Sequence, residues 1–325
     1  MSASKAKDGR QSGHGSHRRR RQTDRWQPHP VLMPLTASQA ERLVQLSEEA
    51  VAKRGYTMRY DGAGALVPVG DNGATVRDGA SAGLMNLART VADLPRQQWR
   101  SAVAAHFDQM TSPDGPPPIP DDLENKLYLR LVCAATIDPE MSKGGPEFAP
   151  GVLTVPATYV GRGVAMHFNI ESLGVPREEA TRMGLANLRS LRDEIDTVRF
   201  DGAEFTLLTG SMFTASRALV FDTVLRESLQ VENPPFGCFV AMPARDMLFV
   251  HVLRDQTMLK ALQLLITTAG SMFSTRPGPV SPHVYYVTNH EWHQVTDHST
   301  GELRVRAIGQ LEDAAQRLGV SETAA

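Results

Sequence analysis

The stretch from residue 201 to 287 constrains the fold most, because it contains most of the chain's well-patterned apolar segments. Residues 203–208 favour a β-strand after an Asp-Gly turn dipeptide. Residues 213–229 carry apolar side chains at three- and four-residue spacing, which predicts an amphipathic helix. The inward-facing positions of this helix are expected to be Phe213, Val220, Phe221 and Val224.

Two short, almost continuously apolar runs follow at 239–242 and 247–253. A Pro-Ala-Arg-Asp turn separates them, so they predict two buried strands joined by a tight turn. Residues 258–272 predict a helix that is apolar over much of its circumference. We therefore expect a central helix in which Leu262 and Leu265 are buried, although it is too short to span a membrane.

Chain length sets the number of domains. The chain has 325 residues, 41% of them hydrophobic, so it can bury a large core and is expected to form two domains. A first domain is predicted over 31–110 in the element order α-β-β-β-α-α, and the proline-rich run 111–124 predicts a linker. A second domain then covers 125–325. Both domains are expected to be α+β, with antiparallel or mixed sheets packed against helices.

The first domain shows clear start signals for its helices. Thr36 and Gln39 form a capping-box pattern, and further helices are expected to begin at Ser81 and Pro95. Turn dipeptides separate three short strands, expected near 56–60, 65–69 and 74–77. The side chains at four-residue spacing on the last helix are expected in the core: Trp99, Val103 and Phe107.

The start of the second domain alternates strands with loops. Strands are predicted over 127–137, 152–155 and 163–170, followed by a helix over 175–192. An acidic run comes directly after that helix and is expected to be a solvated face, formed by Asp193, Glu194 and Asp196.

The N-terminal segment 1–30 lacks any apolar periodicity and is predicted to be disordered. Residues 1–25 hold eight Lys or Arg against two Asp, so the rest of the chain carries a net charge of about −8. One interpretation is contact with nucleic acid or an acidic partner, through Arg18, Arg19, Arg20 and Arg21. The alternative is a solubilising tail without a partner.

Cysteine usage and the lack of a targeting signal predict a cytoplasmic protein. Cys133 and Cys238 stand apart, without a CxxC motif, which is typical of buried thiols in a reducing compartment. No apolar segment follows the arginine run, so neither a secretory nor a twin-arginine signal is predicted. We expect no membrane association.

Four blocks in the C-terminal two thirds resemble a known family. They cover 174–191, 210–225, 240–250 and 280–287. Their order and spacing resemble the YtpQ-like bacterial family of unknown function, which has a helix with an A-x-x-N-L element, a strand leading into an A-S-R helix, and a hairpin. The chain has Thr214 where many members carry Asp, and Ala244-Arg245 where many carry His-Gln. The resemblance implies the α+β fold and assigns no activity.

The element order of the first domain is weakly similar to the secretion-chaperone-like and YbjN-like folds. In those folds the sheet or the helices dock partner segments. The similarity therefore implies a protein partner, and it brings no catalytic residue with it.

One candidate site combines a helix start with a hairpin tip. Ser216 and Arg217 lie in the first turns of the predicted helix, where backbone N–H groups favour anions, and Arg245 and Asp246 lie on the tip that could face it. These four residues are our ligand-binding candidates. The alternative interpretation is a structural Arg217–Asp246 pair that fixes the helix against the hairpin.

A second cluster is rich in histidine: His283, His290, Glu291, His293, Asp297 and His298. Its HExH spacing is one residue shorter than the helical metal motif, so an exposed polar hairpin without metal is predicted. No P-loop, G-x-S-x-G or G-x-G-x-x-G motif occurs, and no cofactor is predicted. The sequence thus favours a non-catalytic binding or regulatory protein. The alternative is a small-molecule or metal-dependent hydrolase with its site near Arg217, Arg245 and Asp246.

Overall fold

The computed structural model describes residues 26–70, 81–110, 119–137, 145–160, 163–297, 303–306 and 308–320. The chain divides into two compact units, Met1–Thr111 and Ser112–Ala325. The fold is α+β, as the sequence predicts. Residues 1–25 of the basic segment and 111–118 of the predicted linker lie outside the described residues. Within the described part, no helix is both long enough and apolar enough to cross a membrane.

The first unit begins with the predicted capping box. Thr36 Oγ1 accepts a hydrogen bond from Gln39 N at 3.4 Å, and Gln39 Oε1 accepts one from Thr36 N at 2.8 Å. These two bonds satisfy the first free N–H groups of α2 (Ala37–Ala52). Within the described residues an antiparallel three-stranded sheet follows, with strands β1 (Met58–Tyr60), β2 (Ala65–Pro68) and β3 (Ala82–Gly83).

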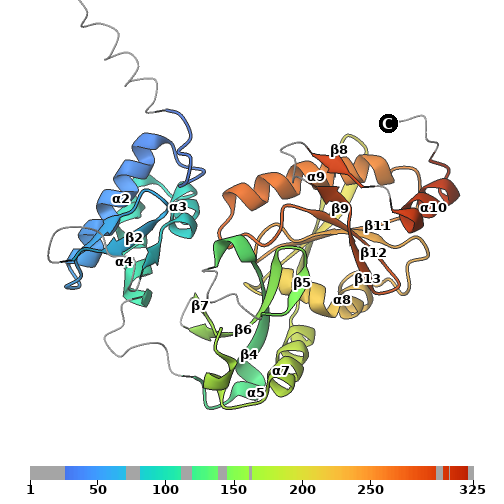
Figure 1. The fold of residues 1–325 in the computed structure, drawn as a ribbon. Helices are drawn as coiled ribbons and strands as arrows, with labels where there is room; N and C mark the ends of the chain where they lie inside the picture. Colours follow the sequence, from blue (N-terminus) through green and yellow to red (C-terminus); the bar gives the residue numbers. More distant parts are fainter. Residues whose placement is uncertain are drawn as a thin grey trace, which may run out of the picture. The chain divides into compact units, whose positions relative to one another are not determined.

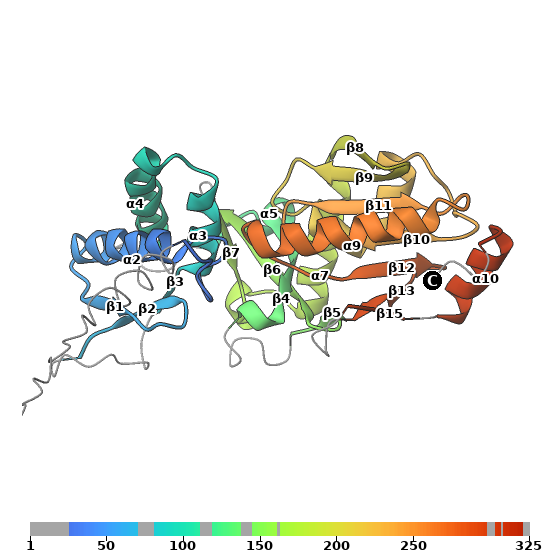
Figure 2. The same ribbon diagram turned by 90° about the horizontal axis from the view of Figure 1, so that it is seen from above.

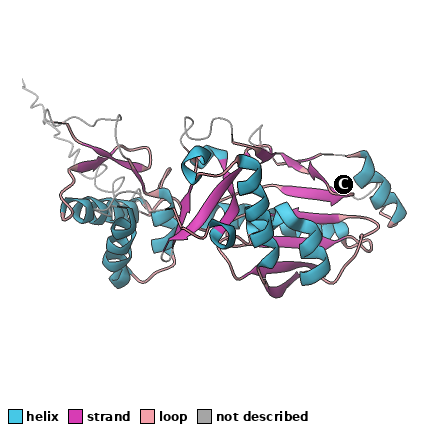
Figure 3. Ribbon diagram, turned by 90° about the horizontal axis from the view of Figure 1, so that it is seen from below, coloured by secondary structure: helices cyan, strands magenta, loops and turns pink. Residues whose placement is uncertain are grey.

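Further helices complete this unit beside its short strands (Figure 3). They are α3 (Met85–Ala92), the 3-10 turn η1 (Arg96–Gln98) and α4 (Trp99–Met110). The helix expected to begin at Ser81 begins at Met85 instead, because Ala82 pairs with Leu66 in β3. Residues 74–77, expected as a strand, lie outside the described residues. The core prediction is confirmed, since Trp99, Val103 and Phe107 are all buried.

The second unit contains a first sheet built on the long antiparallel pair of β4 (Leu127–Cys133) and β6 (Val152–Val160). Strands β5 (Glu147–Ala149) and β7 (Gly163–Met166) also pair with β6. Helix α7 (Arg177–Ser190) buries Leu188 in a cluster with Leu129 of β4. The short helical elements around this sheet are α5 (Leu123–Lys126), η2 (Ala134–Thr136) and η3 (Ile170–Leu173).

A second sheet forms the centre of this unit, with six antiparallel strands among the described residues in the order β13-β12-β10-β11-β9-β8. The strands are β8 (Glu194–Phe200), β9 (Ala203–Thr209), β10 (Cys238–Ala241), β11 (Leu248–Val252), β12 (Val284–Thr288) and β13 (Glu291–Gln294). The predicted hairpin of 239–242 and 247–253 is confirmed as β10 and β11. The acidic run after α7 starts strand β8, which the sequence did not predict.

Helices cover both faces of this sheet, as Figures 1 and 2 show. Helix α9 (Met258–Thr275) packs on the face with Phe205, Phe239 and Phe249, and both Leu262 and Leu265 are buried, as predicted. The opposite face is covered by the consecutive elements η4 (Ala215–Val220), α8 (Phe221–Thr223) and η5 (Val224–Ser228). A final part holds β14 (Thr296–Asp297), β15 (Arg304–Val305) and α10 (Gly309–Arg317).

The predicted regular helix over 213–229 is wrong in its geometry. The segment runs from a 3-10 turn through a short α-helix into a π-helical turn. The first N–H groups of this segment do not bond to the carbonyl four residues earlier. Ser216 N donates to Phe213 O at 2.9 Å, and Ala215 N donates outside the segment to Arg245 O at 3.2 Å. These bonds replace the regular α pattern. The predicted inward-facing residues are nevertheless all buried: Phe213, Val220, Phe221 and Val224.

Candidate functional site

The structure separates the four predicted site residues into two groups. Arg217 belongs to a closed, buried ion pair, and Ser216 contacts the edge of the first sheet. Arg245 and Asp246 lie on the β10–β11 turn, where Asp246 is 3.7 Å from Arg276 at the end of α9. The charges of Arg245 and Asp246 also act on Arg130 of β4. A functional site is therefore built around the second group.

The expected partner of Arg217 is wrong, because Arg217 pairs with Asp193 and not with Asp246. Its Nη1 donates to Asp193 Oδ2, and each side chain is only 1% exposed. Ser228 of the π-helical turn donates to the same carboxylate oxygen at 2.6 Å. Burial raises the pKa of Asp193, while the bonds from Ser228 and Arg217 oppose that rise. The expectation of a solvated Asp193 is also wrong, because its carboxylate is buried against Arg217 and Ser228 of the helical segment.

Ser216 has a structural contact. Its Oγ accepts a hydrogen bond at 2.9 Å from the backbone N–H of Leu131 in β4. Both residues are buried, so this bond satisfies a donor on the free edge of β4 that water cannot reach. The same bond brings β4 next to the start of η4.

The Arg245–Asp246 turn faces the start of η4, as expected for the two groups of site candidates. Arg245 O accepts from Ala215 N at 3.2 Å, and Arg245 N donates to Gly278 O at 2.8 Å. Gly278 has a φ of +69°, and a Cβ atom there would lie 2.6 Å from Arg245 Cδ. Glycine at 278 therefore lets the stem of Arg245 lie against the chain that follows α9.

Arg130 is the functional candidate that the sequence analysis missed. It lies on β4 directly before Leu131 and is only 7% exposed. Its Nε is buried without a hydrogen-bond partner, and within the described residues no ion pair includes Arg130. Burial, assisted by the charge of Arg245, lowers the pKa of Arg130 to about 10, against opposing effects of Tyr159 and Asp246. The signal that could have revealed it is an arginine inside the otherwise apolar run LYLRLVC.

We call Arg130, Arg245, Arg276 and Asp246 the arginine cluster. The Arg276 guanidinium lies 3.7 Å from the Asp246 carboxylate, and both side chains are about one-third exposed. Burial also lowers the pKa of Arg245; the Arg276 charge adds to this effect, and Asp246 opposes it. The cluster thus has three guanidinium groups and one carboxylate among the described residues. Arg130 is its buried member, and Asp246 and Arg276 are its partly exposed members.

Among the described residues, the histidine candidates lie apart from the arginine cluster and make contacts of their own. His290 lies in the β12–β13 turn with a φ of +64°, and His293 Nε2 lies 3.4 Å from Glu291 on the same strand. His283 Nδ1 lies 3.4 Å from Thr296 Oγ1. In the part of the chain that the structure describes, no group of three or more His, Cys, Asp or Glu could hold a metal ion. His298 lies outside the described residues.

Both thiols were expected to be buried, and the structure confirms this for Cys238 only. Cys238 is buried, and burial raises its pKa to about 12. Cys133 is only half-buried, because it ends β4 where the strand gives way to the η2 turn.

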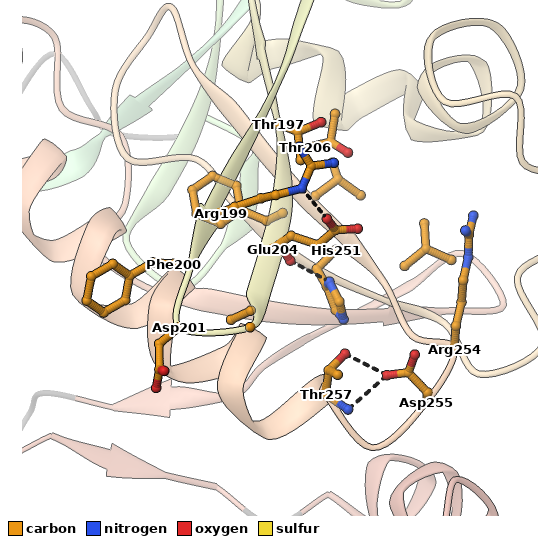
Figure 4. A pocket seen from close by; sticks show the side chains of 15 residues that line it. Thr197, Arg199, Phe200, Asp201, Glu204, Thr206, His251, Arg254, Asp255 and Thr257 are labelled. Atoms are coloured by element: carbon orange, nitrogen blue, oxygen red, sulfur yellow. Dashed lines mark hydrogen bonds and ion pairs between the residues drawn. The ribbon is translucent and has the colours of Figure 1, made fainter.

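A hollow of about 510 Å³ lies where β8 and β9 meet the end of β11 (Figure 4). Several of its charged groups bind each other or neighbouring residues. Arg199 binds Glu204 at 2.9 Å, and Asp255 accepts hydrogen bonds from Thr257 N and Oγ1 at 2.8 and 2.6 Å. His251 Nδ1 lies 2.8 Å from Glu204 O. No described residue that lines this hollow has a buried polar side-chain atom without a hydrogen-bond partner, in contrast to Arg130, and we therefore favour the cluster as the site.

Comparison with family models, with curated proteins and with solved structures finds no match to this chain. The similarity to the YtpQ-like family accordingly stays a prediction from the four sequence blocks. Function has to be argued from the arginine cluster itself.

Proposed function

We propose that this is a non-catalytic binding protein whose second unit holds an anionic ligand in the arginine cluster. The observation that supports the proposal is the environment of Arg130. Its guanidinium is buried beside the like charge of Arg245, and its Nε has no hydrogen-bond partner. Removing an arginine from water in this way costs several kcal/mol unless an anion offsets the cost.

The chemistry of the cluster favours a phosphate or carboxylate group. A guanidinium presents N–H donors in a planar fork that matches two oxygens of such an anion. Three guanidinium groups on different segments would surround the anion, from β4, from the β10–β11 turn and from the end of α9. The carboxylate of Asp246 lies 3.7 Å from the Arg276 guanidinium and helps to hold that arginine in place.

The same composition favours binding over hydrolysis. Arginine keeps its proton and is a poor general base, and the carboxylate of Asp246 lies against a cation. The cluster has cations to neutralise a ligand but brings no nucleophile and base together in a bonded pair. A protein partner and a cytoplasmic location remain predictions from the sequence, independent of this site.

Isothermal titration of the full chain with inorganic phosphate, sulfate and acetate tests the proposal. We expect wild-type protein to bind at least one of these anions, and Arg130→Met to weaken binding by at least tenfold. Arg192→Met is the matched control, because it removes the same charge from an exposed arginine that binds Glu227. We expect the control to bind like wild type.

Stability separates loss of the ligand site from loss of the fold. Removing an uncompensated buried cation should leave the free energy of unfolding unchanged or raise it. The proposal fails if wild-type protein binds none of the three anions, or if folded Arg130→Met binds them as tightly as wild type.

A further inference from the structure

Tyr159 of β6 lies on the same sheet face as Arg130. In the β4–β6 ladder Arg130 is opposite Val155 and Tyr128 is opposite Ala157. Opposite residues of an antiparallel pair share a face, and that face repeats every second residue. Tyr159 therefore belongs to the face that carries Tyr128 and Arg130, and it is 42% exposed.

The ring of Tyr159 is held firmly despite this exposure. It makes edge-to-face contacts with Tyr128 at 5.6 Å and with Phe213 at 5.0 Å between ring centroids. Its hydroxyl lies 3.0 Å from Ser211 Oγ. An aromatic side chain that is already ordered loses little conformational entropy when a ligand packs on it.

Tyr159 is also close to the arginine cluster. It lies on β6, which pairs along its length with the β4 strand that carries Arg130, and its ring contacts Phe213. Phe213, which touches Tyr159, lies two residues before Ala215, and Ala215 is bonded to the Arg245 backbone. The exposed ring of Tyr159 and the turn that carries Arg245 are therefore both in contact with the short segment 213–215.

We infer that the anionic ligand is a phosphate ester of an aromatic group, of the nucleotide class, with its phosphate at the arginine cluster and its base against Tyr159. The inference rests on the proposed function and adds the ligand class. A phosphate monoester carries up to two negative charges near neutral pH, and guanidinium groups bind its oxygens through paired N–H donors. A nucleobase has a flat π-face that stacks on an aromatic side chain.

Titration of the full chain with a nucleoside 5′-monophosphate, ribose 5-phosphate and inorganic phosphate tests this inference. We expect the nucleotide to bind about tenfold more tightly than ribose 5-phosphate, because base stacking on an aromatic ring contributes that much or more. Tyr159→Leu should abolish the difference and leave ribose 5-phosphate affinity unchanged. Tyr159→Phe, which keeps the ring, should retain the difference.

The outcomes distinguish this inference from the proposed function. If wild-type protein binds ribose 5-phosphate as tightly as the nucleotide, the nucleotide inference is overturned and anion binding stands. If folded Tyr159→Leu keeps the full preference for the nucleotide, stacking on Tyr159 is overturned. If none of the three phosphates binds, the inference fails, and sulfate or acetate binding then decides whether the proposed function survives.

Discussion

The guanidinium of Arg217 and the carboxylate of Asp193 form an ion pair in which both side chains are almost fully buried. The pair joins the chain between α7 and β8 to the helical segment on the face of the central sheet. Ser228 Oγ donates a hydrogen bond to the Asp193 carboxylate. The same hydroxyl oxygen accepts a hydrogen bond from Arg217 Nη1 at 3.2 Å. Two separate segments are thus held together by an ion pair whose two side chains are each only 1% exposed.

Breaking this pair should be strongly destabilising. Arg217→Met leaves a buried carboxylate without its cation, and we expect the free energy of unfolding to fall by about 3–5 kcal/mol. Asp193→Asn should also destabilise, and the double variant should recover part of the combined loss. Urea unfolding of the three variants measures this coupling. Simple additivity would contradict the ion pair, and exposed Arg192→Met should change stability by no more than about 1 kcal/mol.

Helix α9 offers a matched pair of leucines. Leu265 is fully buried between the helix and the sheet, whereas Leu259 is 40% exposed. Leu265→Ala should lower the free energy of unfolding by about 2–5 kcal/mol through lost burial and a residual cavity. Leu259→Ala should cost much less. Equal losses for the two variants, measured by urea unfolding, would contradict the packing of α9 on this face.

His251 should make stability depend on pH. Burial lowers its pKa in the folded protein, the nearby charge of Arg254 adds to the effect, and Glu204 and Asp255 oppose it. As pH falls below about 6.5, the unfolded chain takes up a proton that the folded chain accepts only at lower pH. Stability should therefore decrease as pH falls until it passes the folded pKa.

Replacing His251 tests this dependence. His251→Asn keeps an N–H donor near Glu204 O and has no titrating ring, so its loss of stability between about pH 7 and pH 5 should be smaller. Urea midpoints at the two pH values provide the measurement. His290→Asn, at an exposed turn, is the control and should follow wild type. A wild-type pH slope in His251→Asn would contradict the prediction.

Two glycines with the same backbone conformation should respond differently to alanine. Gly237 and Gly174 have φ values of +74° and +70°. A Cβ at 237 would lie 2.5 Å from Val287 O, while nothing lies within 4 Å of one at 174. Gly174→Ala should cost about 1–2 kcal/mol for the left-handed conformation alone. Gly237→Ala should cost clearly more, and equal melting temperatures for the two variants would contradict the close approach of β12.

Local patterns determined much of the fold. The capping residues Thr36 and Gln39 start α2 as predicted, and the core positions of α4 and α9 follow from apolar spacing. The β10–β11 hairpin could be predicted because its two apolar runs are joined by a tight turn. Strand β8 was missed because its side chains are largely exposed, so its strand character depends on pairing with β9. Such pairing has no apolar signature in the segment itself.

The sequence by itself determined the α+β class, most helices and strands, and the candidate residues Arg245 and Asp246. Only the tertiary structure decided which side chains the charged residues contact. Arg217 pairs with the carboxylate of Asp193, 24 residues earlier. The strand that carries Arg130 is held next to η4 by a hydrogen bond from Leu131 N to Ser216 Oγ, 85 positions along the chain. The physical reason is that burial and electrostatic interaction depend on distance in space. Spacing along one segment shows which face a side chain occupies, but the opposing face comes from another segment.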